Sequence, residues 1–205
     1  MRVLSLDAST STIGLAVFDY TNFSDKKLIH HEFYKPPQDG DIFERLAQVR
    51  EYIYSKLDGY QPDNVALEDI ILFMKGHSTA ITVSSLAVLN RTVGLAVYNN
   101  LGKSPELLNV LKIRHAIKTS KILPPKEDIP LLVAHHLKID FPWIFKKGKP
   151  IVENYDMADA MAVGLAYIKI KDIQVKPQKI PKNKKVKINE KSARDIGSVS
   201  RRSRK

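Results

Sequence analysis

The sequence LSLDASTSTIGLAVFD, which spans residues 4–19, decides the fold class of this chain. An apolar run from Arg2 to Asp7 ends in an acid, a turn rich in serine and threonine follows, and Ile13 to Tyr20 then alternates. This pattern predicts two strands joined by a short turn. Leu28 to Tyr34 follows a polar loop and predicts a third strand, so the chain is expected to open with a β-meander.

After residue 40 the pattern changes to alternating helices and strands. Asp41, with Glu44 three residues later, forms a capping box, and apolar residues at helical spacing continue to Leu57. Val65 to Ile70 predicts a fourth strand with Glu68 near its end. The remaining predicted elements are a helix from Ser78 to Leu101, a strand from Leu107 to Leu111, a short helix from Asp128 to Leu137, and a last helix that Asn154 caps and that runs to about Lys171.

This order of elements predicts an α/β fold, with a mixed five-stranded sheet flanked by helices. The chain of 205 residues carries a net charge of +11, and residues 172–205 alone hold twelve Lys or Arg against three Asp or Glu, a net charge of +9. Apolar periodicity disappears in the same segment. We therefore expect one folded domain over residues 1–171, which is nearly neutral, and a disordered basic tail over residues 172–205.

Composition excludes several classes of site and location. The chain has no cysteine, which excludes disulfides, thiolate zinc sites and cysteine nucleophiles. No signal peptide is visible, because the first apolar run reaches Asp7 at once. Thr79 to Tyr98 is the most apolar long stretch, but Asn90 and Arg91 stand near its middle, where a lipid-facing arginine would be costly. We expect a cytoplasmic protein without a membrane segment, in which this stretch is a buried helix.

Four acids fall where such a sheet would bring them together. Asp7 ends the first strand and Glu68 the fourth, so parallel neighbouring strands would place both at one sheet edge; Asp156 and Asp159 share a face of the last helix. Mg²⁺ prefers carboxylate and water oxygens. Two such ions about 4 Å apart can activate a water and stabilise the leaving oxygen of a phosphodiester. The four acids therefore predict a metal-dependent catalytic site.

Each acid also has a purely structural explanation. Asp7 could cap the serine- and threonine-rich turn, Glu68 could be a solvated strand end, and the two helix acids suit the positive end of a helix. Asp159, however, lies between two alanines in an otherwise apolar helix, and an acid on a packed face needs a partner such as a metal. Asp69 should point away from Glu68 and is not included.

Three motifs in this order resemble the RuvC-type Holliday junction resolvases. They are LSLDASTSTIGLAVFD at residues 4–19, LED at residues 67–69 and DMADAMAVGLAY at residues 156–167. The opening motif alone is moderately specific, and the three together are strong. The resemblance extends to about Lys171 and leaves the basic tail uncovered.

The resemblance implies a ribonuclease H-like fold, a divalent metal, a homodimer and paired nicks in four-way DNA junctions. Carried over to this sequence, Asp7 would bridge two Mg²⁺ ions, Glu68 would hold one ion, and Asp156 and Asp159 the other. Mn²⁺ is expected to substitute for Mg²⁺.

The resemblance also suggests DNA contacts. Residues 68–94 form a longer stretch than in bacterial RuvC, where the family inserts residues into the junction. Phe73 is a candidate base-stacking wedge, with a core phenylalanine as the alternative, and Lys75 of the same loop is a candidate DNA contact. Lys118 and Lys126 resemble the two phosphate-contacting lysines of the family, although the loop between them lacks the family's glycines. The preferred junction shape and cleavage sequence therefore do not carry over.

Other classes remain open at this point. Asp7 with Gly14 also approaches the first phosphate loop of sugar kinases and actin-like ATPases, but those folds need two domains and a second glycine-rich loop. A ribonuclease H acting on RNA–DNA hybrids would take a further acid from the first helix, for which Glu44 or Glu51 could serve. A non-catalytic junction-binding protein is the third alternative, and the presence of all four acids argues against it.

The long apolar helix, Ser78 to Leu101, bears on oligomeric state. Its apolar residues spread around most of its circumference, more than one sheet face can cover, so a second surface is expected. We interpret this surface as the contact of a symmetric homodimer. The alternative is a helix enclosed by the other helices of the monomer.

Overall fold

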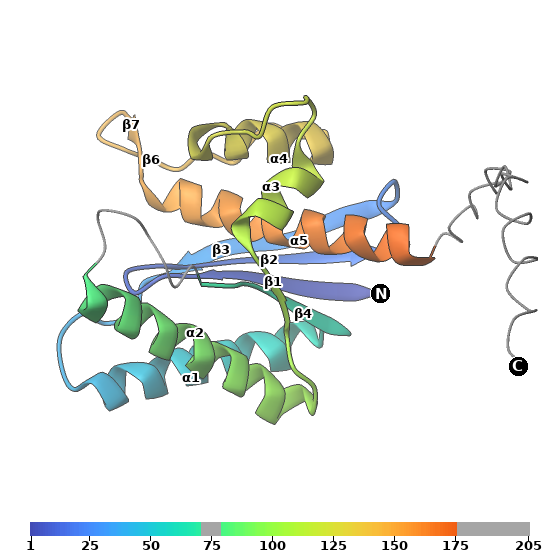
Figure 1. Ribbon diagram of the computed structural model, residues 1–205. Coiled ribbons are helices and arrows are strands. Elements are labelled where there is room, and N and C mark those ends of the chain that lie inside the picture. Colours follow the sequence, from blue (N-terminus) through green and yellow to red (C-terminus); the bar gives the residue numbers. More distant parts are fainter. Residues whose placement is uncertain (71–78, 176–205) are drawn as a thin grey trace, which may run out of the picture. The chain divides into compact units, whose positions relative to one another are not determined.

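The computed structural model describes residues 1–70 and 79–175, and its centre is a mixed five-stranded sheet (Figure 1). The strand order is β3-β2-β1-β4-β5. The first three strands form an antiparallel meander, as the sequence predicted, and β4 lies parallel to both β1 and β5. The strands are β1 (Arg2–Ala8), β2 (Ile13–Tyr20), β3 (Lys26–Tyr34), β4 (Asn64–Glu68) and β5 (Glu106–Leu108).

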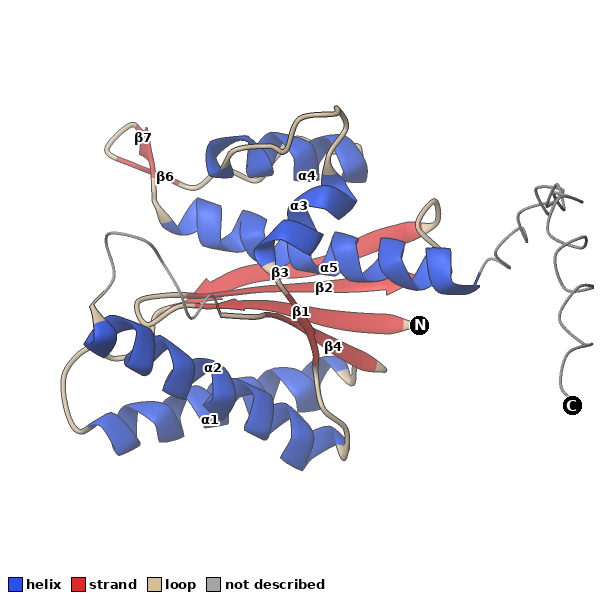
Figure 2. Cartoon of the chain, in the orientation of Figure 1, coloured by secondary structure: helices blue, strands red, loops and turns tan. Residues whose placement is uncertain are grey.

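Helices cover both faces of this sheet (Figure 2). On one face, α1 and α2 pack against apolar side chains such as Leu4, Leu6 and Leu67. On the other, α3, α4 and α5 pack against Val3, Phe18 and their neighbours. The period-two alternation of the strands divides the core in this way. The helices are α1 (Ile42–Tyr60), α2 (Ala80–Leu101), α3 (Val110–Ile117), α4 (Ile129–Leu137) and α5 (Glu153–Val175).

The predicted N-cap of the first helix at Asp41 is confirmed, but its bond goes to Phe43 and not to Glu44 as in the predicted capping box. The carboxylate of Asp41 accepts a hydrogen bond from the backbone N–H of Phe43 at 2.7 Å, so it satisfies one of the free donors of the first turn of α1. The helix ends where Gln61 adopts a left-handed conformation. Thr79 caps α2 in the same manner by accepting from the backbone N–H of Thr82, which puts its first residue two positions after the predicted start.

The predicted strand from Leu107 to Leu111 is wrong over its second half. The strand β5 ends at Leu108, because the side chain of Asn109 accepts a hydrogen bond from the backbone N–H of Lys112 at 2.8 Å and starts α3. Sequence reasoning missed this helix. It also missed a 3-10 turn at Lys126–Asp128. A small hairpin formed by the strands β6 (Phe145–Lys146) and β7 (Lys149–Pro150) was missed as well.

The predicted N-cap of the last helix is also wrong. Asn154 lies inside the first turn of α5, which begins at Glu153. Its buried side chain accepts from the backbone N–H of Ile144 at 2.9 Å and donates to the carbonyl of Ile144 at 2.8 Å. Asn154 therefore fastens the hairpin segment to α5. The helix continues to Val175, four residues past its predicted end.

The prediction that α2 is a buried helix holds for only one of its faces. Leu89, Val93 and Val97 are buried against the sheet and α1, whereas Ile81 and Leu95 are exposed. Within residues 1–70 and 79–175, α2 is the one helix that is long and apolar enough to span a membrane. Its packing against α1 and the sheet identifies it as a layer of the domain.

Candidate active site

Asp7 and Glu68 lie side by side at the carboxyl ends of two parallel strands. Leu6 of β1 is in register with Leu67 of β4, so the next residue of each strand is an acid. Two residues earlier on the same face, Ala66 of β4 belongs to the core under α5. Because side chains alternate along a strand, both acids face the α5 layer. The predicted juxtaposition at one sheet edge is therefore confirmed.

The first turns of α5 bring the other two acids to this edge. Gly14 pairs with Asp7 across β1 and β2. A Cβ atom at position 14 would stand 2.1 Å from the backbone oxygen of Asp156, so only glycine lets α5 approach this closely. The buried hydroxyl of Thr12 hydrogen-bonds the carboxyl group of Asp156. The β1–β2 hairpin thus sets the distance between Asp7 and the acids of α5.

The electrostatics of the four acids show that they act on one another. Burial raises the pKa of Asp7 well above its ordinary value, and the charges of Glu68, Asp159 and Asp156 raise it further. Burial and the charge of Asp159 raise the pKa of Glu68 to about 7. Burial also raises the pKa values of Asp156 and Asp159. Crowded, partly buried carboxyl groups of this kind are stabilised by a nearby cation.

Two basic side chains supply positive charge to the cluster. The ammonium group of Lys126 lies 3.0 Å from Oδ2 of Asp159. Burial alone would lower the pKa of Lys126, but the charge of Asp159 and the hydrogen bond to it outweigh burial and raise that pKa. The guanidinium group of Arg114 acts on Glu68 and on Asp159. Sequence reasoning missed Arg114 because it missed α3; the Asn109 cap was the signal that could have revealed the helix.

The chemistry of the four acids suits a divalent cation. They offer only carboxylate oxygens, the ligands that Mg²⁺ and Mn²⁺ prefer. In the part of the chain that the structure describes, no three His, Cys, Asp or Glu side chains converge into a formed metal site. The ammonium group of Lys126 is instead bonded to Asp159. Metal binding at Oδ2 of Asp159 would therefore require the lysine to move and the carboxylates to draw together.

The structure describes two of the predicted DNA contacts, Lys118 and Lys126, and brings one of them to the acids. Lys126 lies at the cluster, whereas the ammonium group of Lys118 is 3.5 Å from the backbone oxygen of Lys121. Phe73 and Lys75 lie outside the described residues.

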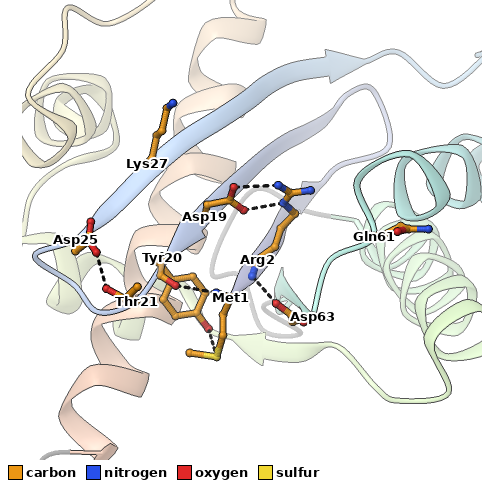
Figure 3. A pocket seen from close by; sticks show the side chains of 9 residues that line it. All are labelled: Met1, Arg2, Asp19, Tyr20, Thr21, Asp25, Lys27, Gln61 and Asp63. Carbon is orange, nitrogen blue, oxygen red and sulfur yellow. Dashed lines mark hydrogen bonds and ion pairs between the residues drawn. The ribbon is translucent and has the colours of Figure 1, made fainter.

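A polar pocket lies at the end of the sheet opposite to the acids (Figure 3). Arg2, at the start of β1, donates from Nε to Oδ1 of Asp19 at 2.7 Å and from Nη2 to Oδ2 at 2.9 Å. This hydrogen bonding lowers the pKa of Asp19. The backbone N–H of Arg2 also donates to Asp63. These contacts join β1, β2 and the start of β4, so we interpret the pocket as structural and separate from the acids.

Comparisons with known proteins agree with this geometry. No family model matches the chain. It is 25% identical over 175 residues to the crossover junction endodeoxyribonuclease RuvC of Ruegeria pomeroyi, across 82% of this chain and 90% of that protein. It is 28% identical over 104 residues to RuvC of Dehalococcoides mccartyi, across 48% of this chain and 62% of that protein. The solved structure of Thermus thermophilus RuvC in complex with Holliday junction substrate has a TM-score of 0.65 and 18% identity, and the match covers 84% of this chain and 96% of that one.

The strand order, together with the acids at the ends of β1 and β4, defines a protein of the ribonuclease H-like fold class. Within this class the chain is RuvC-like, in sequence over 175 residues and in fold over 84% of its length. The predicted fold and the resemblance seen in the sequence are therefore confirmed.

Proposed function

We propose that this protein is a metal-dependent endonuclease that nicks branched DNA and resolves four-way junctions by paired phosphodiester hydrolysis. The observation that carries the proposal is the grouping of Asp7, Glu68, Asp156 and Asp159 at one end of the sheet, with their pKa values raised. The similarity to RuvC supports the same activity. Such an enzyme acts where the DNA is, which for a bacterial or phage protein is the cytoplasm.

Each acid has a role in this proposal. Asp7, between β4 and α5, would bridge two Mg²⁺ ions, Glu68 would hold one, and Asp156 with Asp159 the other. Bound ions of this kind activate a water and stabilise the leaving oxygen of the phosphodiester. The positive charges of Lys126 and Arg114 act on the acids, and these two side chains would bind the phosphate group at the cleavage point.

The RNA–DNA hybrid nuclease is the second candidate, and the structure offers it less support. Glu51 points away from the acids and pairs with Arg50 at 2.8 Å on the exposed side of α1. Glu44 lies on the same helix, which covers the face of the sheet opposite to α5. The test is cleavage of labelled four-way, three-way, duplex and hybrid substrates with Mg²⁺ or Mn²⁺. Preference for the hybrid over the four-way junction would reject the proposal.

We further propose that two copies associate through the exposed face of α2. Ile81, Val88 and Leu95 are spaced seven residues apart, so they lie on one stripe of the helix, and all three are exposed. Such a stripe on a helix otherwise packed in a domain suits a symmetric helix-to-helix contact. A dimer of this kind would present two acid clusters to one junction.

Val88→Glu should convert the dimer to a monomer. A carboxylate at the middle of an apolar contact loses its hydration without gaining a partner, so dimer affinity should fall by at least about tenfold. Light scattering at micromolar concentration, with and without junction DNA, measures the change. The control is Leu131→Glu, an apolar position on α4 that is 65% exposed against 44% for Val88. A wild-type protein that is monomeric under both conditions would reject the dimer.

We propose that the basic C-terminal segment adds DNA affinity without selecting the junction. Residues 176–205 hold twelve Lys or Arg and two Asp or Glu, a net charge of +10. Lysines and arginines bind phosphates and release counterions without recognising shape. Deletion of residues 176–205, which leaves α5 whole, should weaken binding to junction and duplex by similar factors. The salt dependence should become shallower by roughly 0.9 log units per lost phosphate contact.

Binding of both DNAs at two salt concentrations measures this effect. Collapse of the junction-to-duplex affinity ratio would mean that the segment recognises the junction. If neither affinity changes, the segment is not a DNA-binding element.

A further inference from the structure

Two polar residues interrupt the middle of α2, and both connect to the end of β4. Asn90 is 1% exposed, and its Nδ2 donates to the backbone carbonyl of Glu68 at 2.8 Å. Its Oδ1 accepts from Nη1 of Arg91 at 3.1 Å. Nη2 of the same guanidinium group reaches Oδ1 of Asp69 at 3.2 Å. One helix therefore contacts two consecutive residues, Glu68 and Asp69, through a single hydrogen-bonded group.

This network places a buried amide in a largely apolar helix. A buried amide lowers stability unless its polar atoms are bonded, and a leucine at position 90 would suit the core better. Here both polar ends of the Asn90 side chain are bonded. The planar guanidinium group of Arg91 suits two acceptors at once, which a lysine cannot match. The Asn90–Arg91 pair thus binds the backbone and side chain at the end of β4.

Further hydrogen bonds fix the end of β4. The backbone N–H of Asp69 donates to the carbonyl of Leu108 in β5, and the carboxylate of Asp69 accepts from the backbone N–H of Ile70. The parallel pairing of β4 with β1 extends as far as Leu67, so the backbone of Glu68 is held by β5 and by α2. The side chain of Glu68 faces the acid cluster on the other side of the sheet.

We propose that Asn90 and Arg91 form a positioning clamp that holds the Glu68 backbone, and so places its carboxylate for metal binding. The inference rests on the proposed function, because it assumes that Glu68 is a metal ligand. Groups that orient a metal ligand typically affect metal affinity by about 10- to 100-fold. The clamp should therefore act on the affinity for the ion and leave the affinity for junction DNA, measured without metal, unchanged.

The central experiment compares Asn90→Leu with wild type by calorimetric titration of Mn²⁺ and Mg²⁺ into the DNA-free full chain. Leucine has a similar volume but no donor, so the expected result is roughly tenfold weaker metal binding. Cleavage should need correspondingly more metal and recover at saturating metal. The matched control is Val97→Ala, a buried change on the same helix, which should lower the melting temperature and leave metal affinity unchanged.

Arg91 gives a second test that avoids a buried substitution, because this side chain is about half exposed. Arg91→Ala and Arg91→Lys should both weaken metal binding by about threefold or more, since a lysine keeps the charge but cannot bridge Asn90 and Asp69. If Arg91→Lys binds metal like wild type while Arg91→Ala does not, charge rather than positioning explains the effect, and the role of Arg91 in the clamp is wrong.

The outcomes separate the clamp from the proposed function. If wild type binds metal and cuts junctions, and Asn90→Leu has the same metal affinity as wild type, the clamp is wrong and the proposed function stands. Wild type that binds neither ion overturns the metal site, and the clamp falls with it. Weaker metal affinity in Asn90→Leu but not in Val97→Ala, with metal-free junction affinity unchanged in both, supports the clamp.

Discussion

Asp7→Asn should abolish cleavage of four-way junctions while leaving junction binding intact. Asp7 adjoins Glu68 across the parallel β1–β4 pair and interacts electrostatically with both acids of α5. Replacing its carboxylate by an amide removes the ligand proposed to bridge the ions. Metal ions stabilise such transition states by several kcal/mol, so a loss of about 10³-fold or more in rate is expected. Single-turnover cleavage with Mg²⁺ and a gel-shift assay without metal measure the two properties.

The same substitution should stabilise the metal-free protein. Burial and three neighbouring acids disfavour the charged form of Asp7, so a neutral amide relieves both effects. The melting temperature without metal should rise, by roughly 2–4 °C for each kcal/mol gained. Added Mg²⁺ should stabilise wild type more than the variant. Full cleavage by Asp7→Asn would remove Asp7 from the catalytic site.

The pH dependence of stability provides an independent check on the cluster. The pKa of Glu68 is raised from 4.5 to about 7, so the folded, metal-free protein binds more protons than the unfolded chain between these values. Its stability should therefore fall as the pH rises through this window. Glu68→Gln should make the decline shallower. Melting curves at pH 5, 6, 7 and 8 in the presence of a chelator provide the measurement.

Gly14→Ala should lower the rate of cleavage by about 10²-fold, although it removes no functional group from the site. The added methyl group would stand 2.1 Å from the backbone oxygen of Asp156 and 3.1 Å from Cβ of Ala160, so α5 has to shift. Overpacking of this kind costs about 1–3 kcal/mol. A displacement of about 1 Å in a catalytic geometry lowers the rate by about 10²-fold.

Gly59→Ala is the matched control for this prediction. A Cβ atom at position 59 meets nothing within 4 Å, and alanine is the better helix former by about 1 kcal/mol. This variant should be as stable as wild type or more so, and fully active. Thermal melting and single-turnover cleavage of both variants decide the matter. Wild-type activity in Gly14→Ala would show that the approach of α5 does not control the site.

The strands and the four acids could be predicted from the sequence because their signals are local. Two apolar strands end in Asp7 and Glu68, and two acids stand three positions apart on one helix. Once β1 and β4 are parallel, this spacing determines which way the four acidic side chains face. The α3 helix could not be recognised in the same way. It is only eight residues long, and its apolar residues follow a strand directly, so the cap at Asn109 was the one signal of a change.

The basic residues of the site depend on packing that sequence spacing does not reveal. Lys118 and Lys126 looked alike in the sequence, yet only Lys126 reaches an acid of α5. Arg114 acts on Glu68 because α3 packs against α5. The exposed stripe of α2 was similarly undetermined, because composition alone cannot show which of its apolar residues the domain covers.

The ion pair between Lys126 and Asp159 has a consequence for the proposed binding of metal. An ammonium group tethered beside a carboxylate competes with a dissolved ion at an effective concentration set by the chain, which dilution of the protein does not lower. If Asp159 is a metal ligand, as proposed, a dissolved ion has to displace this local competitor from the carboxylate. A phosphate that draws Lys126 away would weaken this competition, so DNA and metal should each strengthen the binding of the other by the same factor.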